Sequence, residues 1–278
     1  MKNVIKIIGI LFLLFSGMAC KRNQAVPGPE VNPPAKAGPI IKVMTYNIHI
    51  GNPPSKPAEV RDLQAIANVI NSQKPDLVAL QEVDVNTQRS GVNVDQAKEL
   101  ARLTGMNYFY AKAIDFQGGQ YGDAVLSRFP ILESVSYQLP VTQQLGGETR
   151  SVAMITVEKE GYKFYFSSTH LDHLGAEDNR LLQAAELNKI VGSLSRPLII
   201  AGDMNAIPSS KTMALLQQQL FMGCNAACPF TIPATAPTRT IDYIMMRPYN
   251  KFNIKNYNVI NETYASDHLP LIAEIELK

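Results

Sequence analysis

From Ile40 to the C-terminus, short apolar runs alternate with amphipathic stretches. Apolar residues three and four positions apart predict helices over 60–70, 94–103, 181–190 and 211–220. The apolar runs predict strands over 41–47, 77–82, 107–112, 123–128, 131–138, 151–158, 163–169, 198–203, 241–246, 254–260 and 270–277. So many strands exceed what one open sheet normally holds. The pattern therefore predicts two sheets packed face to face, with the helices on their outer faces.

The composition is that of one globular domain. Apolar residues make up 46% of the 278 residues and charged residues 18%. The formal net charge is only +2, and Lys and Arg form no cluster in the body of the chain. Proteins that bind nucleic acid through many phosphates usually present a basic face. The charge pattern therefore argues against a tight nucleic-acid partner, although it allows a hydrolase that binds a single phosphate.

The first 20 residues are typical of an export signal. Lys2 and Lys6 precede an apolar run over 7–19, which is shorter than the roughly 20 apolar residues of a membrane span. The run ends in small residues before Cys20, a pattern that resembles a bacterial lipoprotein signal in which this cysteine carries the lipid. Gly17 stands where such signals usually have a larger aliphatic residue, so a simple cleaved signal and an uncleaved anchor stay open.

Residues 21–39 are predicted to be a proline-rich tether. They contain five prolines and almost no large apolar side chain, so they cannot bury enough surface to order themselves. A lipid on Cys20 and this tether would hold a domain over 40–278 at a membrane, outside the cytoplasm, in the periplasm or at the cell surface. Such compartments permit disulfides. Cys224 and Cys228 are therefore expected either to form a loop-stapling disulfide or to be two buried free thiols.

Polar side chains stand at the ends of several predicted strands. A long loop is predicted over 221–240, which contains three prolines and runs directly into one of these positions. Acids, amides and histidines that come singly from different strand ends are typical of an assembled hydrolytic site. The residues are Asn47, Glu82, His170, Asp203, Asn205, Asp242, Asp267 and His268.

Six short motifs around these residues carry a resemblance to a known family. They are Thr45-Tyr46-Asn47-Ile48-His49, Leu80-Gln81-Glu82-Val83, Ser168-Thr169-His170-Leu171-Asp172, Ala201-Gly202-Asp203-Met204-Asn205, Ile241-Asp242-Tyr243-Ile244 and Ser266-Asp267-His268-Leu269-Pro270. In this order they resemble the endonuclease/exonuclease/phosphatase superfamily, which includes deoxyribonuclease-like nucleases, sphingomyelinases and inositol polyphosphate 5-phosphatases. The resemblance extends from about residue 40 to the end of the chain. It implies an α/β fold, a four-layer α/β/β/α sandwich of two mixed sheets, and metal-dependent hydrolysis of a phosphoester.

The resemblance also implies a Mg²⁺ site, in which Mn²⁺ or Ca²⁺ could substitute. Glu82 matches a direct ligand, and hard divalent cations prefer carboxylate oxygens and keep several waters. Asn47 and Asp267 are expected to complete the surroundings of the ion, directly or through water. A cation at this place neutralises phosphate charge and stabilises the leaving oxygen.

The catalytic residues follow from the same resemblance. Asp203 is expected to orient or deprotonate the attacking water, and Asn205 to hold the phosphate beside it. His170 and His268 are expected to flank the phosphate and donate hydrogen bonds to its oxygens. Asp242 matches a carboxylate that orients the final histidine and supports its cationic form.

Four further residues have more than one interpretation. Arg150 matches a family arginine near the phosphate, where a guanidinium can bind two oxygens at once, and otherwise it would be a surface residue at a strand start. Asp123 stands where the family often has asparagine, and its charge would either aid a cation or repel a substrate. His173 is expected to be an exposed loop residue as readily as a site residue, and His49 a packing or surface residue.

These features together predict a secreted, lipid-tethered, Mg²⁺-dependent phosphodiesterase or phosphatase. It would act as a monomer on a small molecule or a lipid headgroup, through in-line attack by water. An extracytoplasmic nuclease that cleaves DNA or RNA is the alternative. A non-catalytic binding module on this fold would be expected to have lost an acid or a histidine, and the chain retains all of them.

Overall fold

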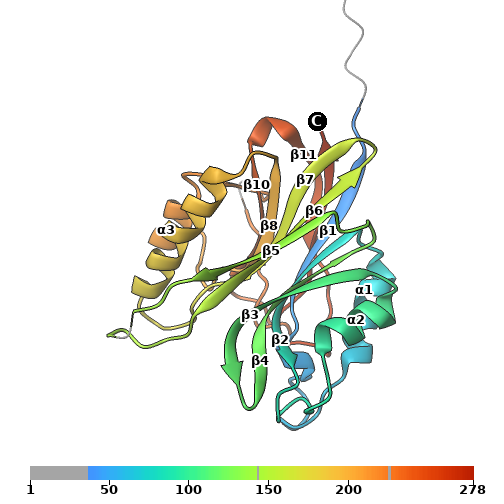
Figure 1. Ribbon diagram of the computed structural model, residues 1–278, viewed down its shortest axis with the longest axis vertical. Helices are drawn as coiled ribbons and strands as arrows, with labels where there is room; N and C mark the ends of the chain where they lie inside the picture. Colours follow the sequence, from blue (N-terminus) through green and yellow to red (C-terminus); the bar gives the residue numbers. More distant parts are fainter. Residues whose placement is uncertain (1–36, 143, 225–226) are drawn as a thin grey trace, which may run out of the picture. The chain divides into compact units, whose positions relative to one another are not determined.

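Two six-stranded sheets form the centre of the fold (Figure 1). The strand order is β11-β12-β1-β2-β4-β3 in the first sheet and β5-β6-β7-β8-β10-β9 in the second. In both sheets one pair of neighbours is parallel, β1 with β2 and β7 with β8, and the other pairs are antiparallel. The predicted pair of mixed sheets is therefore confirmed. The strands are β1 (Ile40–Asn47), β2 (Leu77–Val85), β3 (Asn107–Phe116), β4 (Gly119–Ser127), β5 (Glu133–Leu139), β6 (Arg150–Lys159), β7 (Tyr162–His170), β8 (Leu198–Asp203), β9 (Phe221–Met222), β10 (Asp242–Arg247), β11 (Phe252–Val259) and β12 (Leu271–Leu277).

This computed structural model describes residues 37–142, 144–224 and 227–278. Residues 37–278 form one compact unit. The proposed signal peptide over 1–20 and the proposed tether, apart from its last three residues, lie outside the described residues. Within the described ranges, no helix is both long enough and apolar enough to cross a membrane.

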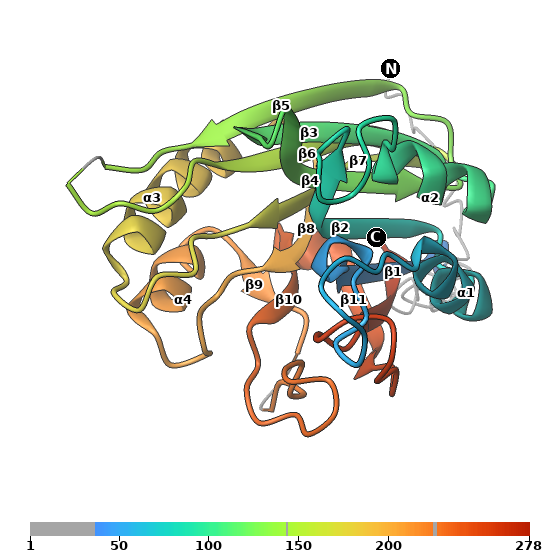
Figure 2. The same ribbon diagram turned by 90° about the horizontal axis from the view of Figure 1, so that it is seen from below.

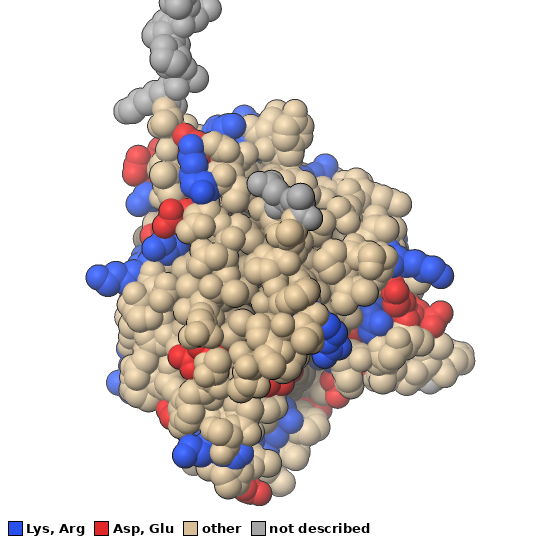
Figure 3. Space-filling model, turned by 180° about the vertical axis from the view of Figure 1, so that it is seen from behind, with Lys and Arg blue, Asp and Glu red and all other residues tan. Residues whose placement is uncertain are grey.

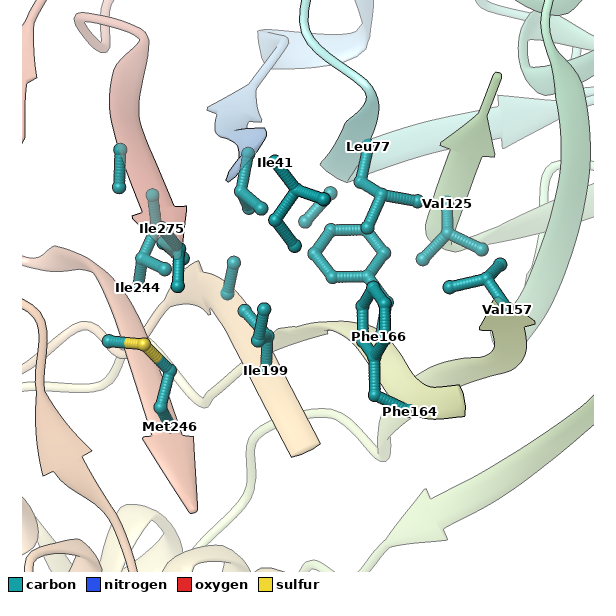
Figure 4. Packing of buried hydrophobic residues seen from close by; sticks show 14 of the residues in the cluster. Ile41, Leu77, Val125, Val157, Phe164, Phe166, Ile199, Ile244, Met246 and Ile275 are labelled. Carbon is teal, nitrogen blue, oxygen red and sulfur yellow. The ribbon is translucent and has the colours of Figure 1, made fainter. Parts of the chain in front are cut away.

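The space between the sheets is filled by side chains from alternate positions of the strands. These positions are almost fully buried because successive residues of a strand point to opposite faces of its sheet. Figure 4 shows this layer, in which Ile41, Leu77 and Val125 of the first sheet lie near Phe164, Phe166 and Ile199 of the second. The resulting rigid double sheet fixes the positions of the strand ends.

Helices cover the outer face of each sheet (Figure 2). Ile66 of α1 and Leu100 of α2 belong to the buried cluster on the outer face of the first sheet. Leu187 of α3 and Leu216 of α4 belong to the corresponding cluster on the second sheet. The predicted four-layer α/β/β/α sandwich is therefore confirmed. The helices are α1 (Leu63–Gln73), α2 (Gln96–Thr104), α3 (Asp178–Ser193) and α4 (Lys211–Leu216), with short 3-10 helices η1 (His49–Gly51) and η2 (Tyr249–Lys251).

Capping side chains decide where the first two helices begin. The carboxylate of Asp62 accepts a hydrogen bond from the backbone N–H of Ala65 at 2.9 Å, so α1 begins at Leu63, later than the apolar spacing predicts. Asp95 accepts from the N–H of Lys98 at 2.9 Å and starts α2 in the same way. The apolar stripe alone did not reveal these boundaries because the residues before a cap can also be apolar.

Two segments outside the predicted strands contain regular structure. The glycine-rich stretch over 118–122 belongs largely to β4, which forms a hairpin with β3 through Gln117 and Gly118. The predicted loop over 221–240 contains the short strand β9 and an isolated bridge between Ile232 and Arg239. Cys224 and Cys228 form a disulfide in this region, which resolves the two alternatives for the cysteines.

Candidate active site

The two sheets bring four strand ends to one place. Asn47 ends β1, His170 ends β7, Asp203 ends β8 and Asp242 begins β10. The antiparallel pairing of β8 with β10 puts Asp242 directly opposite Asp203. The parallel pairing of β7 with β8 puts His170 beside Asp203. The registers of the sheets therefore assemble residues that lie far apart in the sequence.

Two of the residues at this place have a left-handed backbone conformation. Glu82 lies where the register between β2 and β4 shifts, and its φ is +58°. Asn205 has a φ of +47°. Non-glycine residues rarely adopt this left-handed region, and such strain is concentrated at functional sites. Gly202 precedes Asp203, and a Cβ at Gly202 would overlap the carbonyl oxygen of Thr169, so the close approach of β7 and β8 requires a glycine.

Asp203 is the central carboxylate of the site. Its Oδ1 accepts a hydrogen bond from the backbone N–H of Asn205 at 2.8 Å, and its Oδ2 accepts from Nδ2 of Asn47 at 3.2 Å. The same Oδ2 lies 3.5 Å from Nε2 of His170 and 3.8 Å from Nε2 of His268. The side chain of Asp203 is only 2% exposed. Four predicted residues therefore converge on this one group.

His268 is paired with Asp242. Nδ1 of His268 lies 2.9 Å from Oδ2 of Asp242, and both side chains are nearly fully buried. Burial acts to lower the pKa of His268, but the charge and hydrogen bond of Asp242, together with Asp203 and Asp267, raise that pKa to about 10. Burial, together with the charge of Asp242, raises the pKa of Asp203 to about 7. His268 is therefore a cation at neutral pH, beside a carboxylate that can exchange a proton near neutrality.

His170 has the opposite character. Burial, and then the charges of Arg150, His268 and His173, hold the pKa of His170 well below its usual range. Nε2 of His170 lies 2.9 Å from Nδ2 of Asn205, which also donates to the carbonyl oxygen of Leu171 at 3.0 Å. Because the amide nitrogen can only donate, Nε2 of a neutral His170 accepts this bond and the ring proton lies on Nδ1. His170 and Asn205 thus hold each other in place.

The three predicted metal-binding residues lie next to this group. Nδ2 of Asn47 donates to Oε1 of Glu82 at 3.1 Å. Asp267 is connected through Ser266, whose Oγ donates to the carbonyl oxygen of Asn47 at 2.7 Å and lies 3.4 Å from Oδ1 of Asp267. Among the described residues no Lys or Arg forms an ion pair with Glu82 or Asp267, although Nδ1 of His49 lies 3.9 Å from Asp267. Two carboxylates and an amide without a Lys or Arg partner fit a hard divalent cation.

A second group could also hold a metal ion. Ligand atoms of Asp203, Asp242 and His268 all lie within 4.8 Å of one another, and all three residues are buried. However, Nδ1 of His268 is engaged by Asp242, and the raised pKa keeps the imidazole protonated. A metal ion at this group would have to displace the imidazole proton. The arrangement suits proton chemistry at the Asp203–Asp242–His268 group, and the surroundings of Glu82 fit a cation without such a displacement.

Arg150 is buried at the start of β6, with 2% of its surface exposed. Its Nη2 lies 3.1 Å from Nδ1 of His173 and 3.6 Å from Oε2 of Glu148. The alternative of a surface arginine is therefore wrong. His173 is exposed, as one of its interpretations required, but its contact with Arg150 makes it part of the site as well. His49 is half-buried, and its Nδ1 lies 2.9 Å from the carbonyl oxygen of Asn52.

A cavity of about 620 Å³ opens onto these residues. Asn47, Asp242 and Asp267 do not line it, although Asn47 contacts Asp203 and Asp242 contacts His268, both of which do. Much of the lining was not predictable, because a side chain in a hairpin or loop carries no local sign that it faces a cavity. The predicted residues that line the cavity are Glu82, Arg150, His170, Asp203, Asn205 and His268, and those not predicted include Arg89, Ile114, Phe116, Tyr121, Glu148, Leu174 and Arg239.

Asp123 does not line the cavity and is only 1% exposed. Its Oδ2 lies 2.6 Å from Oγ of Ser151, which in turn lies 3.1 Å from the carbonyl oxygen of Ala111. The single proton of Ser151 can satisfy only one of these two acceptors, so a protonated Asp123 completes both bonds. Burial raises the pKa of Asp123 to about 8, which agrees with this arrangement. At neutral pH Asp123 therefore adds no full negative charge to the site.

Comparison with known proteins agrees with this geometry. The chain is 26% identical over 251 residues to the uncharacterized protein YbhP of Escherichia coli (strain K12), a match that covers 85% of this chain and 96% of YbhP. Its fold is similar to that of an endonuclease/exonuclease/phosphatase from Beutenbergia cavernae DSM 12333, with a TM-score of 0.71, 24% identity and coverage of 86% of this chain and 72% of that one. It is also similar to the mannosyl-6-phosphatase Bt3783 of Bacteroides thetaiotaomicron VPI-5482, with a TM-score of 0.66, 20% identity and coverage of 84% and 99%. Residues 44–268 match the Endonuclease/Exonuclease/phosphatase family, so the chain belongs to this family, whose members are metal-dependent hydrolases of phosphoesters.

Proposed function

We propose that this chain is a Mg²⁺-dependent phosphodiesterase or phosphatase that cleaves a small-molecule or lipid-headgroup phosphoester by in-line attack of water. The surroundings of Asp203 carry this proposal. One buried carboxylate faces both a neutral and a cationic histidine, and it borders a cavity that also contains Arg150. These are the base, the charged donor and the phosphate ligand that such a reaction requires.

Asp203 is the proposed general base. A base works best when its pKa lies near the operating pH, and the pKa of Asp203 is raised to about 7. Its Oδ1 is held by Asn205 and its Oδ2 by Asn47, so the carboxylate has a fixed direction. Asp203 would take a proton from water as the water oxygen bonds to phosphorus and the ester oxygen departs.

His268 and Arg150 are the proposed donors to the phosphate. The cationic His268, held by Asp242, can donate from Nε2 to a nonbridging oxygen on which negative charge develops. Arg150 can bind two phosphate oxygens at once, with His173 supporting its guanidinium. His170 is proposed to act through Asn205, whose side-chain amide contacts Nε2 of His170 and whose backbone N–H donates to Asp203.

Glu82, Asn47 and Asp267 are proposed to hold Mg²⁺, or Mn²⁺ or Ca²⁺ in its place. When bound, the ion would neutralise phosphate charge and stabilise the leaving oxygen. The left-handed backbone of Glu82 supports this assignment, as does the lack of a Lys or Arg partner in the part of the chain that the structure describes.

The charged side chains on one face of the molecule favour a small substrate over nucleic acid. On the face drawn in Figure 3, basic and acidic side chains are interspersed and form no continuous basic patch. A nuclease that neutralises many phosphates usually has such a patch. An extracytoplasmic nuclease that contacts only a few phosphates is the alternative outcome of the test below.

The cellular setting forms a separate part of the proposal. We propose that the chain is a monomeric lipoprotein, attached to a membrane through Cys20 and positioned outside the cytoplasm by the segment over 21–39. The disulfide between Cys224 and Cys228 supports an oxidising compartment. Metabolic labelling with a radioactive fatty acid, in the wild-type chain and in Cys20→Ser, tests the anchor directly.

The function is tested with the soluble domain that begins at residue 37. Its activity should be assayed on bis-p-nitrophenyl phosphate, p-nitrophenyl phosphate, mannose 6-phosphate, plasmid DNA and sphingomyelin, each with Mg²⁺ and with EDTA. We expect Mg²⁺-dependent turnover of a small phosphoester. Cleavage of plasmid DNA alone would favour the nuclease, and the absence of both turnover and Mg²⁺ binding would overturn the proposed enzyme.

A further inference from the structure

One wall of the cavity is apolar and adjoins the proposed phosphate site. Ile114 and Phe116 come from the end of β3, and Tyr121 comes from the start of β4. All three side chains are only partly buried. Tyr121 also lies beside Arg150: burial raises the pKa of Tyr121 and the neighbouring Arg150 acts to lower it, while Tyr121 acts to raise the pKa of Arg150. The wall is therefore continuous with the place where the phosphate would bind.

Arg89 forms the polar edge of this wall. Its Nε and Nη2 donate to the two oxygens of Asp84 at 2.8 and 2.9 Å, and Asp84 is fully buried and also accepts from two neighbouring hydroxyl groups. The guanidinium carbon lies 4.4 Å from the ring centre of Phe116 and 5.3 Å from that of Tyr121. The side chain is still 29% exposed and lines the cavity. Arg89 is thus held in one orientation, with part of its guanidinium group exposed to the cavity.

The hairpin that carries the wall is fixed to the segment that carries Arg89. The backbone N–H of Gln88 donates to the carbonyl oxygen of Gln117 at 3.1 Å. The backbone N–H of Arg89 donates to the side-chain oxygen of Gln117 at 3.0 Å. Although β3 is an edge strand, its end is therefore held against a second element, and the apolar wall is formed before any ligand binds.

We infer that this wall, made of Ile114, Phe116, Tyr121 and Arg89, binds a ring of the substrate that has a flat apolar face and hydrogen-bond acceptors at its edge. A pyranose and a nucleobase share this chemistry. The inference rests on the proposed function, because it assumes that the phosphoester lies beside Asp203 and Arg150. The ring face would pack on Ile114 and Phe116, and its edge would accept from Arg89.

The charge of Arg89 favours a polar ring over a long acyl chain. The cavity, at about 620 Å³, has room for much more than one phosphate group. An acyl chain on the same wall would cover the open edge of Arg89 without offering it an acceptor, which is unfavourable for a charged group. A ring with oxygen or nitrogen atoms at its edge could pack on the apolar part of the wall and accept hydrogen bonds from the charged part.

The test compares ring and acyclic phosphoesters. For monoesters, KM should be measured for two ring compounds, mannose 6-phosphate and adenosine 5′-monophosphate, and for the acyclic glycerol 3-phosphate. For diesters, the p-nitrophenyl ester of thymidine 5′-phosphate is the ring compound and glycerophosphocholine the acyclic one. The variant is Phe116→Ala, with Phe230→Ala as control, because Phe230 is 53% exposed and lies outside the cavity. Binding of the same compounds to Asp203→Asn by calorimetry gives a readout that does not need turnover.

We expect the wild-type protein to prefer ring compounds and Phe116→Ala to reduce that preference by about tenfold, the size of a lost ring-stacking contact. Phe116→Leu, which keeps apolar volume without a flat ring, should show a smaller loss and serves if Phe116→Ala does not fold. Equal affinity for ring and acyclic compounds, or a preference for acyl-chain phosphoesters, would overturn the ring site. Ring-selective binding without turnover of any compound would uphold the ring site and contradict the proposed hydrolase instead.

Discussion

Nδ1 of His268 lies 2.9 Å from Oδ2 of Asp242, and the two residues come from the loop before β12 and the start of β10. The pair is buried, and it raises the pKa of His268 to about 10. The carboxylate therefore fixes both the orientation and the charge of an imidazole that faces Asp203. Under the proposed function, Asp242 would act on the chemistry in the cavity through His268, although Asp242 does not line the cavity.

Replacing Asp242 by Asn should lower kcat by about two to four orders of magnitude, because His268 loses the partner that orients it and keeps it charged. KM should change much less, since Asp242 does not line the cavity. Steady-state kinetics on the best substrate measures both constants. The exposed Asp178→Asn is the matched control, and a kcat within twofold of wild type in Asp242→Asn would refute the assigned role.

The same pair predicts how stability depends on pH. The folded-state pKa of His268 is raised above its unfolded value of about 6.5, so the pair stabilises the fold fully below that pH and loses its effect as pH rises through about 10. The difference in free energy of unfolding between the wild-type protein and Asp242→Asn should therefore shrink between pH 7 and pH 10. Urea unfolding at these pH values measures it, and a constant difference would mean that the histidine is neutral throughout.

Replacing Asp123 by Asn should change the pH dependence of stability through a group that is separate from the His268–Asp242 pair. The folded-state pKa of Asp123, about 8, exceeds its unfolded value of about 3.9, so its stabilising contribution is complete below pH 4 and disappears as pH rises through 8. Asn can donate to Ser151 at every pH. Relative to wild type, the variant should gain on the order of 4 kcal/mol between pH 5 and pH 9, because about three pKa units are lost in this range and each corresponds to about 1.4 kcal/mol. Parallel stability curves for the two proteins would show that Asp123 is ionised throughout.

Glu82→Gln should weaken Mg²⁺ binding by at least about tenfold, because the amide lacks the charge that a hard cation prefers. Calorimetric titration with Mg²⁺ measures this without any substrate. Glu59→Gln changes an exposed acid and should bind as wild type does. Unchanged affinity in Glu82→Gln would move the cation to the group of Asp203, Asp242 and His268.

Arg150→Lys should raise KM by about tenfold while the protein stays folded, because lysine keeps the charge but loses the two-pronged contact with phosphate. The exposed Arg102→Lys is the control for a general effect of the exchange. Inhibition by inorganic phosphate gives an independent measure of the same contact. An unchanged KM and an unchanged inhibition constant would place the phosphate elsewhere in the cavity.

The alternation of apolar residues was sufficient to predict the two sheets and the outer helices. Positions such as Ile41 and Phe166 are buried because they point between the sheets, and that pattern is local in the sequence. The caps Asp62 and Asp95 set helix starts through hydrogen bonds that apolar spacing does not encode. The strand β9 was missed because it has only two residues.

The site was predictable where short motifs marked strand ends, as at Asp203 and His268. The cavity wall was not, because Phe116 and Arg89 come together only through the β3–β4 hairpin and a buried contact with Asp84. The raised pKa of Asp123 comes from its burial between the assembled strands, and its hydrogen-bond partner Ser151 lies far away in the sequence. Such properties belong to the folded arrangement and leave no local pattern.

The central claim is that Asp203 is the base of a metal-dependent phosphoester hydrolase. The most direct measurement is turnover of bis-p-nitrophenyl phosphate and mannose 6-phosphate by wild-type protein and Asp203→Asn, with Mg²⁺ and with EDTA. We predict turnover only with Mg²⁺, a loss of at least about a thousandfold in Asp203→Asn, and an unchanged melting temperature. Equal turnover by the folded variant, or turnover that persists in EDTA, would contradict the claim.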